Sequence, residues 1–203
     1  MYFYQVERRV KRLIKRLPNE PSVPGKLSET KQDIILSSIL LCSAELEDFV
    51  EFKILQIINL SYRKWVDHNK YTLSLVSFAH RMHPAKNKEK IAKVAEVFSR
   101  NTDNLITDAY HQAIRHVNNN HGLSEKNLID LLKLVGADED LLSSEINLLA
   151  NFTDRRGAIA HKGSKRHGVP NTNSPNIIKN DMLQVLSAIR AISSHLDDIR
   201  KKI

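Results

Sequence analysis

The sequence predicts an all-α fold, and two observations carry that prediction. Gly and Pro number six each in 203 residues, and most of them fall in two stretches, residues 18–25 and 163–175. Because these residues interrupt helices, their clustering leaves long segments free of breakers. Within those segments, apolar residues recur every three or four positions, and the alternation typical of a half-buried strand is nearly absent.

The N-terminal part contains one short and one long predicted helix. Residues 2–17 form a basic helix whose apolar side consists of Val6, Val10, Leu13, Ile14 and Leu17. A loop follows to residue 28, and the long helix extends from Thr30 to about Val66. Its inward positions repeat at helical spacing: Ile35, Ile39, Cys42, Leu46, Phe49, Val50, Ile54, Ile57 and Ile58. A helix of this length is typical of the backbone of a bundle.

The middle of the chain is divided by turn signals into shorter predicted helices. They span residues 71–82, 88–100 and 103–117, and Pro84 ends the first of them. The Asn-rich stretch that leads to Gly122 is a turn. Ser124 can cap a further helix over residues 125–135, and Gly136 stops it.

Two helices complete the predicted bundle. One opens at Asp138 or Glu139, has Leu142, Ile146, Leu149, Phe152 and Thr153 on its inner side, and ends at Lys162. After a polar loop, the last helix has these inward residues: Ile178, Met182, Val185, Leu186, Ile189, Ile192 and Leu196. We expect residues 1–29 to pack on or extend a single helical domain over residues 30–203, in which residues 67–136 form a helical insert.

Composition narrows the class of protein. The net charge of +8, with 31 Lys and Arg against 23 Asp and Glu, favours an anionic partner. One cysteine, Cys42, excludes an intrachain disulfide and a thiolate zinc site. No signal peptide is recognisable, and the most apolar stretch is too charged to span a membrane. These features predict a cytoplasmic protein without membrane insertion.

Several chemistries lack their signatures in this sequence. We find no Gly-rich phosphate loop, no GxSxG and no HExxH. The closely spaced histidine pairs, His80 with His83 and His111 with His116, have no carboxylate at a common metal-motif spacing. Aromatic residues make up 6% of the chain, so a surface of stacked aromatics is not predicted either. We therefore expect no metal and no cofactor.

The segment from Arg155 to Gly163 carries the clearest chemical signal. It places the guanidinium groups of Arg155 and Arg156 near the imidazole of His161 at a helix end. An arginine can hold a phosphate through a bidentate fork, and a histidine can exchange a proton near neutrality. Together these groups suffice for RNA cleavage without a metal, since His161 can accept the proton of a ribose 2′-hydroxyl while an arginine stabilises the charged phosphate.

Spacing alone does not single out this segment. With 13 Arg and nine His in the chain, about two pairs separated by four to six residues are expected by chance. Other such pairs exist: Arg63 with His68, Arg115 with His121, and Arg190 with His195. Only the pair ending at His161 follows an apolar helix and precedes a basic, glycine-containing loop.

Residues 156–163, Arg-Gly-Ala-Ile-Ala-His-Lys-Gly, resemble the Arg-Asn-x-Ile-Ala-His-x-Gly segment of HEPN domains. Residues 46–49, Leu-Glu-Asp-Phe, resemble the Leu-Glu-x-Phe element in the first core helix of the RiboL-PSP-like HEPN group. The resemblance implies an antiparallel helical bundle with additional helices, which dimerises and brings two Arg/His sets into one cleft. It also implies a metal-independent endoribonuclease that acts as a toxin of a toxin–antitoxin or phage-defence system.

On this chain the resemblance maps the motif arginine to Arg156 and the motif histidine to His161. It also implies that Glu47 orients an arginine or the histidine, and we expect the adjacent Arg155 to assist. Gly157 stands where the family commonly has Asn, Asp or His, and this departure favours an alternative function. In that alternative the chain is a non-catalytic dimeric module that binds RNA, a nucleotide or a protein partner such as an antitoxin.

Each of these residues also has a structural interpretation. Cations at the end of a helix interact favourably with its dipole, which would explain Arg156, His161 and Lys162 without chemistry. Glu47 can be an ordinary solvated or interface carboxylate. Lys162, Lys165 and Arg166 can contact RNA phosphates or lie in a solvated loop. The basic N-terminal helix can bind RNA, a membrane surface or an acidic partner, or simply pack on the bundle with its charges in water.

Overall fold

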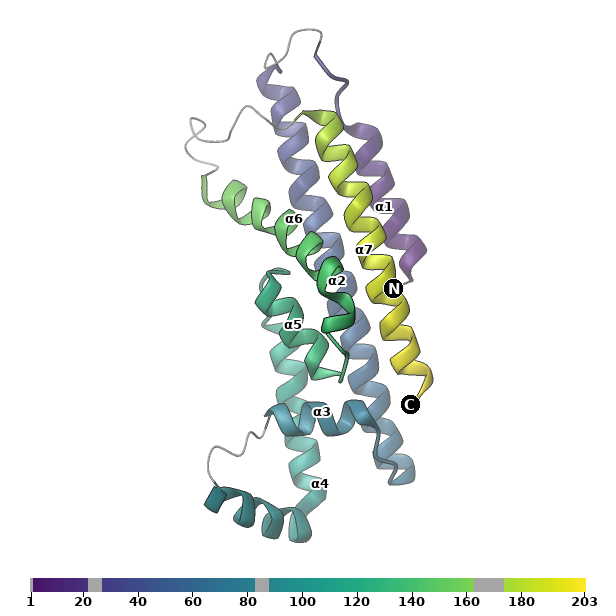
Figure 1. The fold of residues 1–203 in the computed structure, drawn as a ribbon, viewed down its shortest axis with the longest axis vertical. Coiled ribbons are helices and arrows are strands. Elements are labelled where there is room, and N and C mark those ends of the chain that lie inside the picture. The colour runs from purple at the N-terminus through teal and green to yellow at the C-terminus, as the bar shows by residue number, and fades with distance from the viewer. Residues whose placement is uncertain (1, 22–26, 83–87, 163–173) are drawn as a thin grey trace. The chain divides into compact units, whose positions relative to one another are not determined.

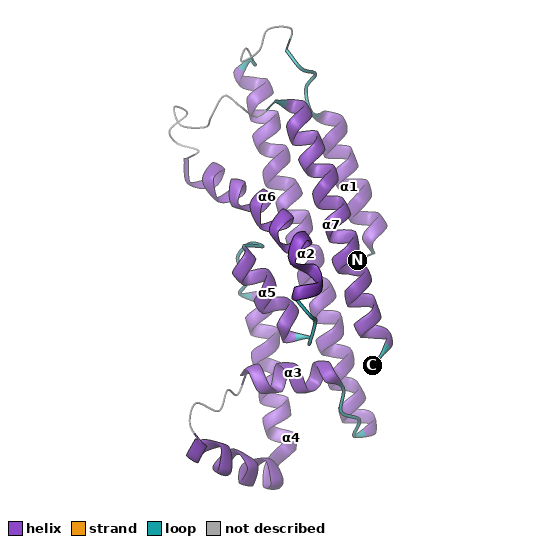
Figure 2. Cartoon of the chain, in the orientation of Figure 1, coloured by secondary structure: helices purple, strands orange, loops and turns teal. Residues whose placement is uncertain are grey.

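The described part of the chain is helical (Figures 1 and 2). The computed structural model describes residues 2–21, 27–82, 88–162 and 174–203, and of residues 88–101, 156–158 and 160–162 it describes the backbone alone. Within these ranges it contains no strand. The elements, in order, are α1 (Phe3–Arg16), α2 (Glu29–His68), α3 (Leu73–Met82), α4 (Lys88–Asn118), α5 (Glu125–Leu134), the short 3₁₀ turn η1 (Asp140–Leu142), α6 (Ser143–Lys162) and α7 (Pro175–Lys201). The all-α prediction is confirmed.

The contacts divide the chain into two compact units. Unit 1 comprises Met1–Val50, Gly122–Leu128 and Asp140–Ser194, and unit 2 comprises Glu51–His121, Ile129–Glu139 and His195–Ile203. Helices α2, α5 and α7 therefore contribute to both units. The single domain over residues 30–203, with its insert at 67–136, stays a prediction.

Unit 1 is built around the first half of α2. Every inward residue predicted there is buried, as are those predicted on α6 and α7. Helix α1 buries Val6 and Val10 and is joined to two other helices by ion pairs. Arg9 contacts Glu45 of α2 at 2.8 Å, and Glu7 contacts Arg190 of α7 at 3.0 Å. The basic N-terminal helix thus packs on the bundle of this unit.

Unit 2 is built around the second half of α2, from which Ile54, Ile57 and Ile58 are buried. Helix α3 is joined by two contacts to α5 and to the residue that follows it. The hydroxyl of Ser74 donates to the carbonyl of Val135 at 2.7 Å, and Arg81 pairs with Asp130 at 2.7 Å. On the α4 side, Tyr62 and Tyr110 stack with ring centroids 4.1 Å apart, a pairing that the composition did not predict.

Three predicted boundaries were wrong. Helix α2 begins at Glu29, so Thr30 lies inside its first turn, and α6 begins at Ser143 after the 3₁₀ turn. The two helices predicted over 88–100 and 103–117 are one helix, α4, although its ribbon changes direction along its length (Figure 1). The residues between them, Asn101 and Thr102, cost only a few tenths of a kcal/mol each in a helix, which is too little to end one.

Within the described ranges, no helix combines the length and the apolar character that crossing a membrane requires.

The end of α5 depends on a glycine. Gly136 has φ +76°, its N–H donates to the carbonyl of Lys133, and the N–H of Ala137 donates to Leu132. These two bonds make a Schellman motif, which satisfies carbonyls that the helix itself leaves open. A Cβ at position 136 would lie 2.7 Å from Oγ of Ser77 and 3.3 Å from Cγ of Leu73. Both the backbone conformation and the space require glycine here.

We therefore expect Gly136→Ala to lower the free energy of unfolding by about 2 kcal/mol, since a left-handed conformation alone costs an L-residue roughly 1–2 kcal/mol. Urea denaturation measures it. Adding Ser77→Ala removes the closest steric contact, so the double variant should recover part of the lost unfolding free energy. The loss that remains is then the cost of the left-handed backbone conformation. A Gly136→Ala protein as stable as the wild type would contradict this account.

Cys42 provides a pH-dependent reporter of the core. Its side chain is fully buried, and burial, with a smaller contribution from the charge of Glu45, raises the pKa of the thiol from 9.0 to about 12. Above pH 9 the unfolded chain loses this proton and the folded chain keeps it. Stability should therefore fall as the pH rises toward the pKa of the folded state.

From about pH 8 to about pH 10, the wild type should lose on the order of 1.4 kcal/mol more unfolding free energy than Cys42→Ala, which lacks the thiol. Urea denaturation of both proteins at both pH values tests this, because other titrating groups affect the two alike. Equal pH dependence would mean that the thiol is exposed in the folded state.

Candidate active site

Helix α6 carries the predicted site toward its C-terminal end. Its inner residues Ile146, Leu149 and Phe152 are buried in unit 1, and its backbone stays helical through Lys162. Positions 156, 161 and 162 thus lie in its last two turns, while their side chains are outside the described residues. Lys165 and Arg166 lie wholly outside them. The structure therefore places the motif on a helix end and leaves the roles of its side chains as predictions.

One turn before the motif, α6 is fastened to the segment that precedes α5. Thr153 is 7% exposed, and its hydroxyl donates to the carbonyl of Leu123 at 2.9 Å. Leu123 is itself fully buried. Because a buried carbonyl without a donor is costly, this bond fixes the position of α6 close to Arg155 and Arg156.

The same turn is held by Glu47 of α2. Gly122 has φ +90°, and its N–H donates to the carboxylate of Glu47, which is 9% exposed. The carbonyl of Gly122 accepts from the amide of Asn127 of α5 at 3.2 Å. The turn at Gly122–Leu123 thus connects α2, α5 and α6. Glu47 has a structural contact here, and its orienting role toward an arginine or the histidine stays a prediction.

Arg155 is engaged with α7. Its Nη1 lies 2.5 Å from Oδ2 of Asp181, with 41% and 23% of the two side chains exposed. A pair this exposed contributes little stability, typically below about 1 kcal/mol, but it directs Arg155 toward α7. The arginine predicted to assist Arg156 is therefore a partner of Asp181 in this structure.

The helical backbone separates the two motif positions around the helix. Positions five residues apart lie about 140° apart around an α-helix axis, and this holds for 156 and 161 while α6 continues to Lys162. The same separation of about 140° applies to Arg190 and His195 within α7, so it counts against those two side chains acting together on one phosphate.

Among the described residues, no group of three His, Cys, Asp or Glu side chains is arranged to hold a metal ion. His80, His111 and His116 are exposed, and His83 lies outside the described residues. Of the predicted groups at this helix end, the structure describes the guanidinium of Arg155, and the chemistry of Arg156 and His161 stays a prediction. Thr153, Leu123 and Asp181, which position that end, were not among the predicted site residues, because only their neighbours in space give them this role.

Comparison with known families agrees with the motif resemblance. A sequence model described as RiboL-PSP-HEPN matches residues 3–200, which is nearly the whole chain. No curated protein and no solved structure gives a significant match. The family supports a nucleotide-binding or RNase-like module.

We expect Thr153→Val to lower the free energy of unfolding by about 1–2 kcal/mol, because it leaves the buried carbonyl of Leu123 without its donor at constant side-chain volume. Thr153→Ser keeps the hydroxyl and should recover most of the hydrogen-bond energy. Chemical denaturation of the three proteins gives the comparison. If the valine variant matched the wild type and the serine variant did not, removal of the methyl group would be the relevant change.

Proposed function

The chain belongs to the RiboL-PSP-HEPN family, and from that premise we propose that it is a metal-independent endoribonuclease. The observation that carries the proposal is the position of Arg156 and His161 at the end of α6, a helix anchored by Thr153 just before the motif. We further propose that it works in the cytoplasm as a toxin or a phage-defence effector, restrained by an antitoxin or another partner protein.

The proposed reaction is an internal transfer of the phosphate. His161 accepts the proton of a ribose 2′-hydroxyl, and the 2′-oxygen attacks the adjacent phosphorus. The bond from phosphorus to the 5′-oxygen breaks, and an imidazolium returns a proton to that oxygen. Arg156 holds the non-bridging oxygens, where charge develops. The products are a 2′,3′-cyclic phosphate and a free 5′-hydroxyl, and we assign further phosphate contacts to Lys162, Lys165 and Arg166.

We place the active site in a homodimer. The angle of about 140° between positions 156 and 161 around α6 disfavours their joint action within one chain. In a two-fold dimer, Arg156 of one protomer can face His161 of its partner. The dimer then completes the site, and a monomer would cleave poorly.

A second candidate function rests on Gly157. The family commonly has a polar side chain at this position, and glycine supplies none. A chain that keeps Arg156 and lacks this group could hold RNA or a nucleotide without cleaving it. In that case Arg156→Ala would weaken RNA binding and no protein would produce cyclic phosphate ends.

The test is cleavage of a mixed-sequence RNA in EDTA. We expect His161→Ala to slow cleavage by about 10²–10⁴-fold, as removal of a general base does, and Arg156→Ala by about 10²–10³-fold. His68→Ala is the matched control, because His68 also follows an arginine by five residues and is exposed at the end of α2. Equal cleavage by the wild type and His161→Ala would reject the assignment.

Mixing the two inactive variants tests the dimer. If Arg156 and His161 act across the interface, an equal mixture of Arg156→Ala and His161→Ala should regain about a quarter of wild-type activity, since half the dimers are mixed and one of their two sites is intact. Action within one chain would leave the mixture inactive.

A further inference from the structure

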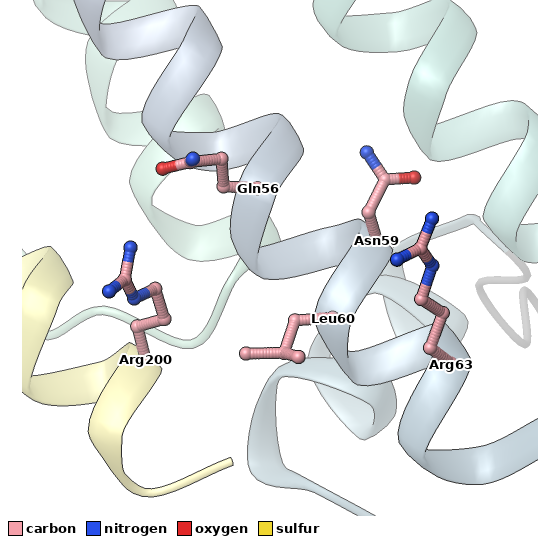
Figure 3. A pocket seen from close by; sticks show the side chains of 5 residues that line it. All are labelled: Gln56, Asn59, Leu60, Arg63 and Arg200. Carbon is pink, nitrogen blue, oxygen red and sulfur yellow. The ribbon is translucent and has the colours of Figure 1, made fainter. Parts of the chain in front are cut away.

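Unit 2 contains an open groove between the second half of α2 and the end of α7 (Figure 3). It encloses about 530 Å³ and is lined by Gln56, Asn59, Leu60 and Arg63 of α2 and by Arg200 of α7. The α2 residues occupy positions i, i+3, i+4 and i+7, so they share one face of that helix. None of these residues belongs to the motif on α6.

An ion pair between a buried lysine and a partly exposed aspartate positions the α7 side of the groove. Lys53 is 7% exposed, and its amine contacts the two carboxylate oxygens of Asp197 at 2.7 and 2.8 Å. A buried ammonium needs such a partner, because leaving it unpaired costs several kcal/mol. Arg200 lies three residues after Asp197, on the same side of α7, so the pair places Arg200 opposite α2.

The lining of the groove carries two guanidinium groups and no carboxylate, and the two aspartates that precede Arg200 on α7 are each paired with a lysine. Asp197 pairs with Lys53, and Asp198 pairs with Lys201 at 2.9 Å, a contact that lowers the pKa of Asp198. No carboxylate lines the groove. Arg63 and Arg200 are exposed, and neither has an ion-pair partner within the described part of the chain.

The amide of Asn59 has a fixed orientation. Its Oδ1 accepts a hydrogen bond from the hydroxyl of Tyr110 at 2.7 Å, and Tyr110 stacks on Tyr62. With its oxygen occupied, Asn59 has its NH₂ group to offer a ligand. The groove therefore presents two guanidinium groups and an amide donor around the side chain of Leu60, and Gln56 adds a second amide (Figure 3).

We propose that this groove binds a stretch of the RNA backbone, with Arg63 and Arg200 on its phosphates. The inference rests on the proposed function, for which it supplies a second substrate-binding surface outside α6. Guanidinium groups match phosphate geometry, and amide donors suit phosphate, ribose and base oxygens alike. An open groove with exposed charges suits a continuous strand better than an enclosed small molecule, for which sites are concave and largely apolar.

The experiment measures binding of a short labelled single-stranded RNA by fluorescence anisotropy, in the His161→Ala background so that cleavage does not interfere. At about 0.1 M salt, replacing Arg63 and Arg200 by Gln should weaken binding about 25-fold, or about fivefold for each phosphate that is no longer neutralised. The slope of log K against log salt should fall in magnitude by about 1.4. Arg63→Lys with Arg200→Lys keeps both charges and should retain most of the slope.

The control removes the same charge elsewhere. Lys31→Gln with Lys179→Gln changes two exposed lysines of unit 1 and should leave both the affinity and the slope nearly unchanged. Circular dichroism and thermal midpoints should agree among all these proteins, because the substituted side chains are exposed. If Lys31→Gln with Lys179→Gln weakened binding as much as Arg63→Gln with Arg200→Gln does, the effect would be one of net charge and the groove would not be a site.

Two competitors identify the ligand. Poly-glutamate that displaced RNA as well as unlabelled RNA does, or a mononucleotide that did so, would overturn the assignment to an RNA strand.

Cleavage by the wild type separates this inference from the proposed function. Cleavage with unchanged RNA binding in the arginine variant rejects the groove alone, whereas weakened binding without any wild-type cleavage rejects the nuclease and keeps the groove. Absence of RNA binding in the His161→Ala background rejects the groove as well.

Discussion

The apolar stripe of α2 is the constraint on which the other packing depends. The helix has 40 residues and carries buried side chains from Ile35 to Trp65, so it supplies core residues to both units. Helices α1 and α6 belong to the unit of its first half, α3 and α4 belong to the unit of its second half, and α5 and α7 contribute residues to both units. A helix this long could not remain ordered by propensity alone, because most helical stability in proteins comes from packing of the apolar face.

The turn at Gly122–Leu123 links α2 to α6, and this link helps to position the helix that carries the candidate site. It receives a carboxylate from α2 and a hydroxyl from α6, so the two helices are linked through a short segment of backbone. Arg155 adds a contact to α7 through Asp181. The turns of α6 that hold Arg156 and His161 therefore follow a part of the helix with three neighbours. This is the kind of rigid support that a reacting group requires.

Periodicity predicted the helices and their inward faces, because burial of an apolar stripe repeats in the sequence. Cys42, Phe152 and Met182 are examples of residues assigned to the core in this way and found there. The break predicted near Asn101 failed because weak helix formers do not end a helix. The contacts of Thr153, Asp181 and Arg200 could not be predicted, since each depends on which helices meet. The motif was recognisable only because the segment with Arg156 and His161 resembles a family pattern. Several other Arg–His pairs in the chain have a similar spacing.

Unit 1 is made of three separated stretches of the chain. This arrangement has a consequence for folding during synthesis on the ribosome. The pair between Glu7 and Arg190 joins residues 183 positions apart, and Asp181 comes 26 residues after its partner Arg155. Contacts of such separation must close long loops before they stabilise anything. A growing chain therefore cannot complete the bundle around α6 until α7 has left the ribosome. Until then, α6 lacks the contact with α7 that Arg155 and Asp181 provide, so the helix that carries the motif gains its full support only late in synthesis.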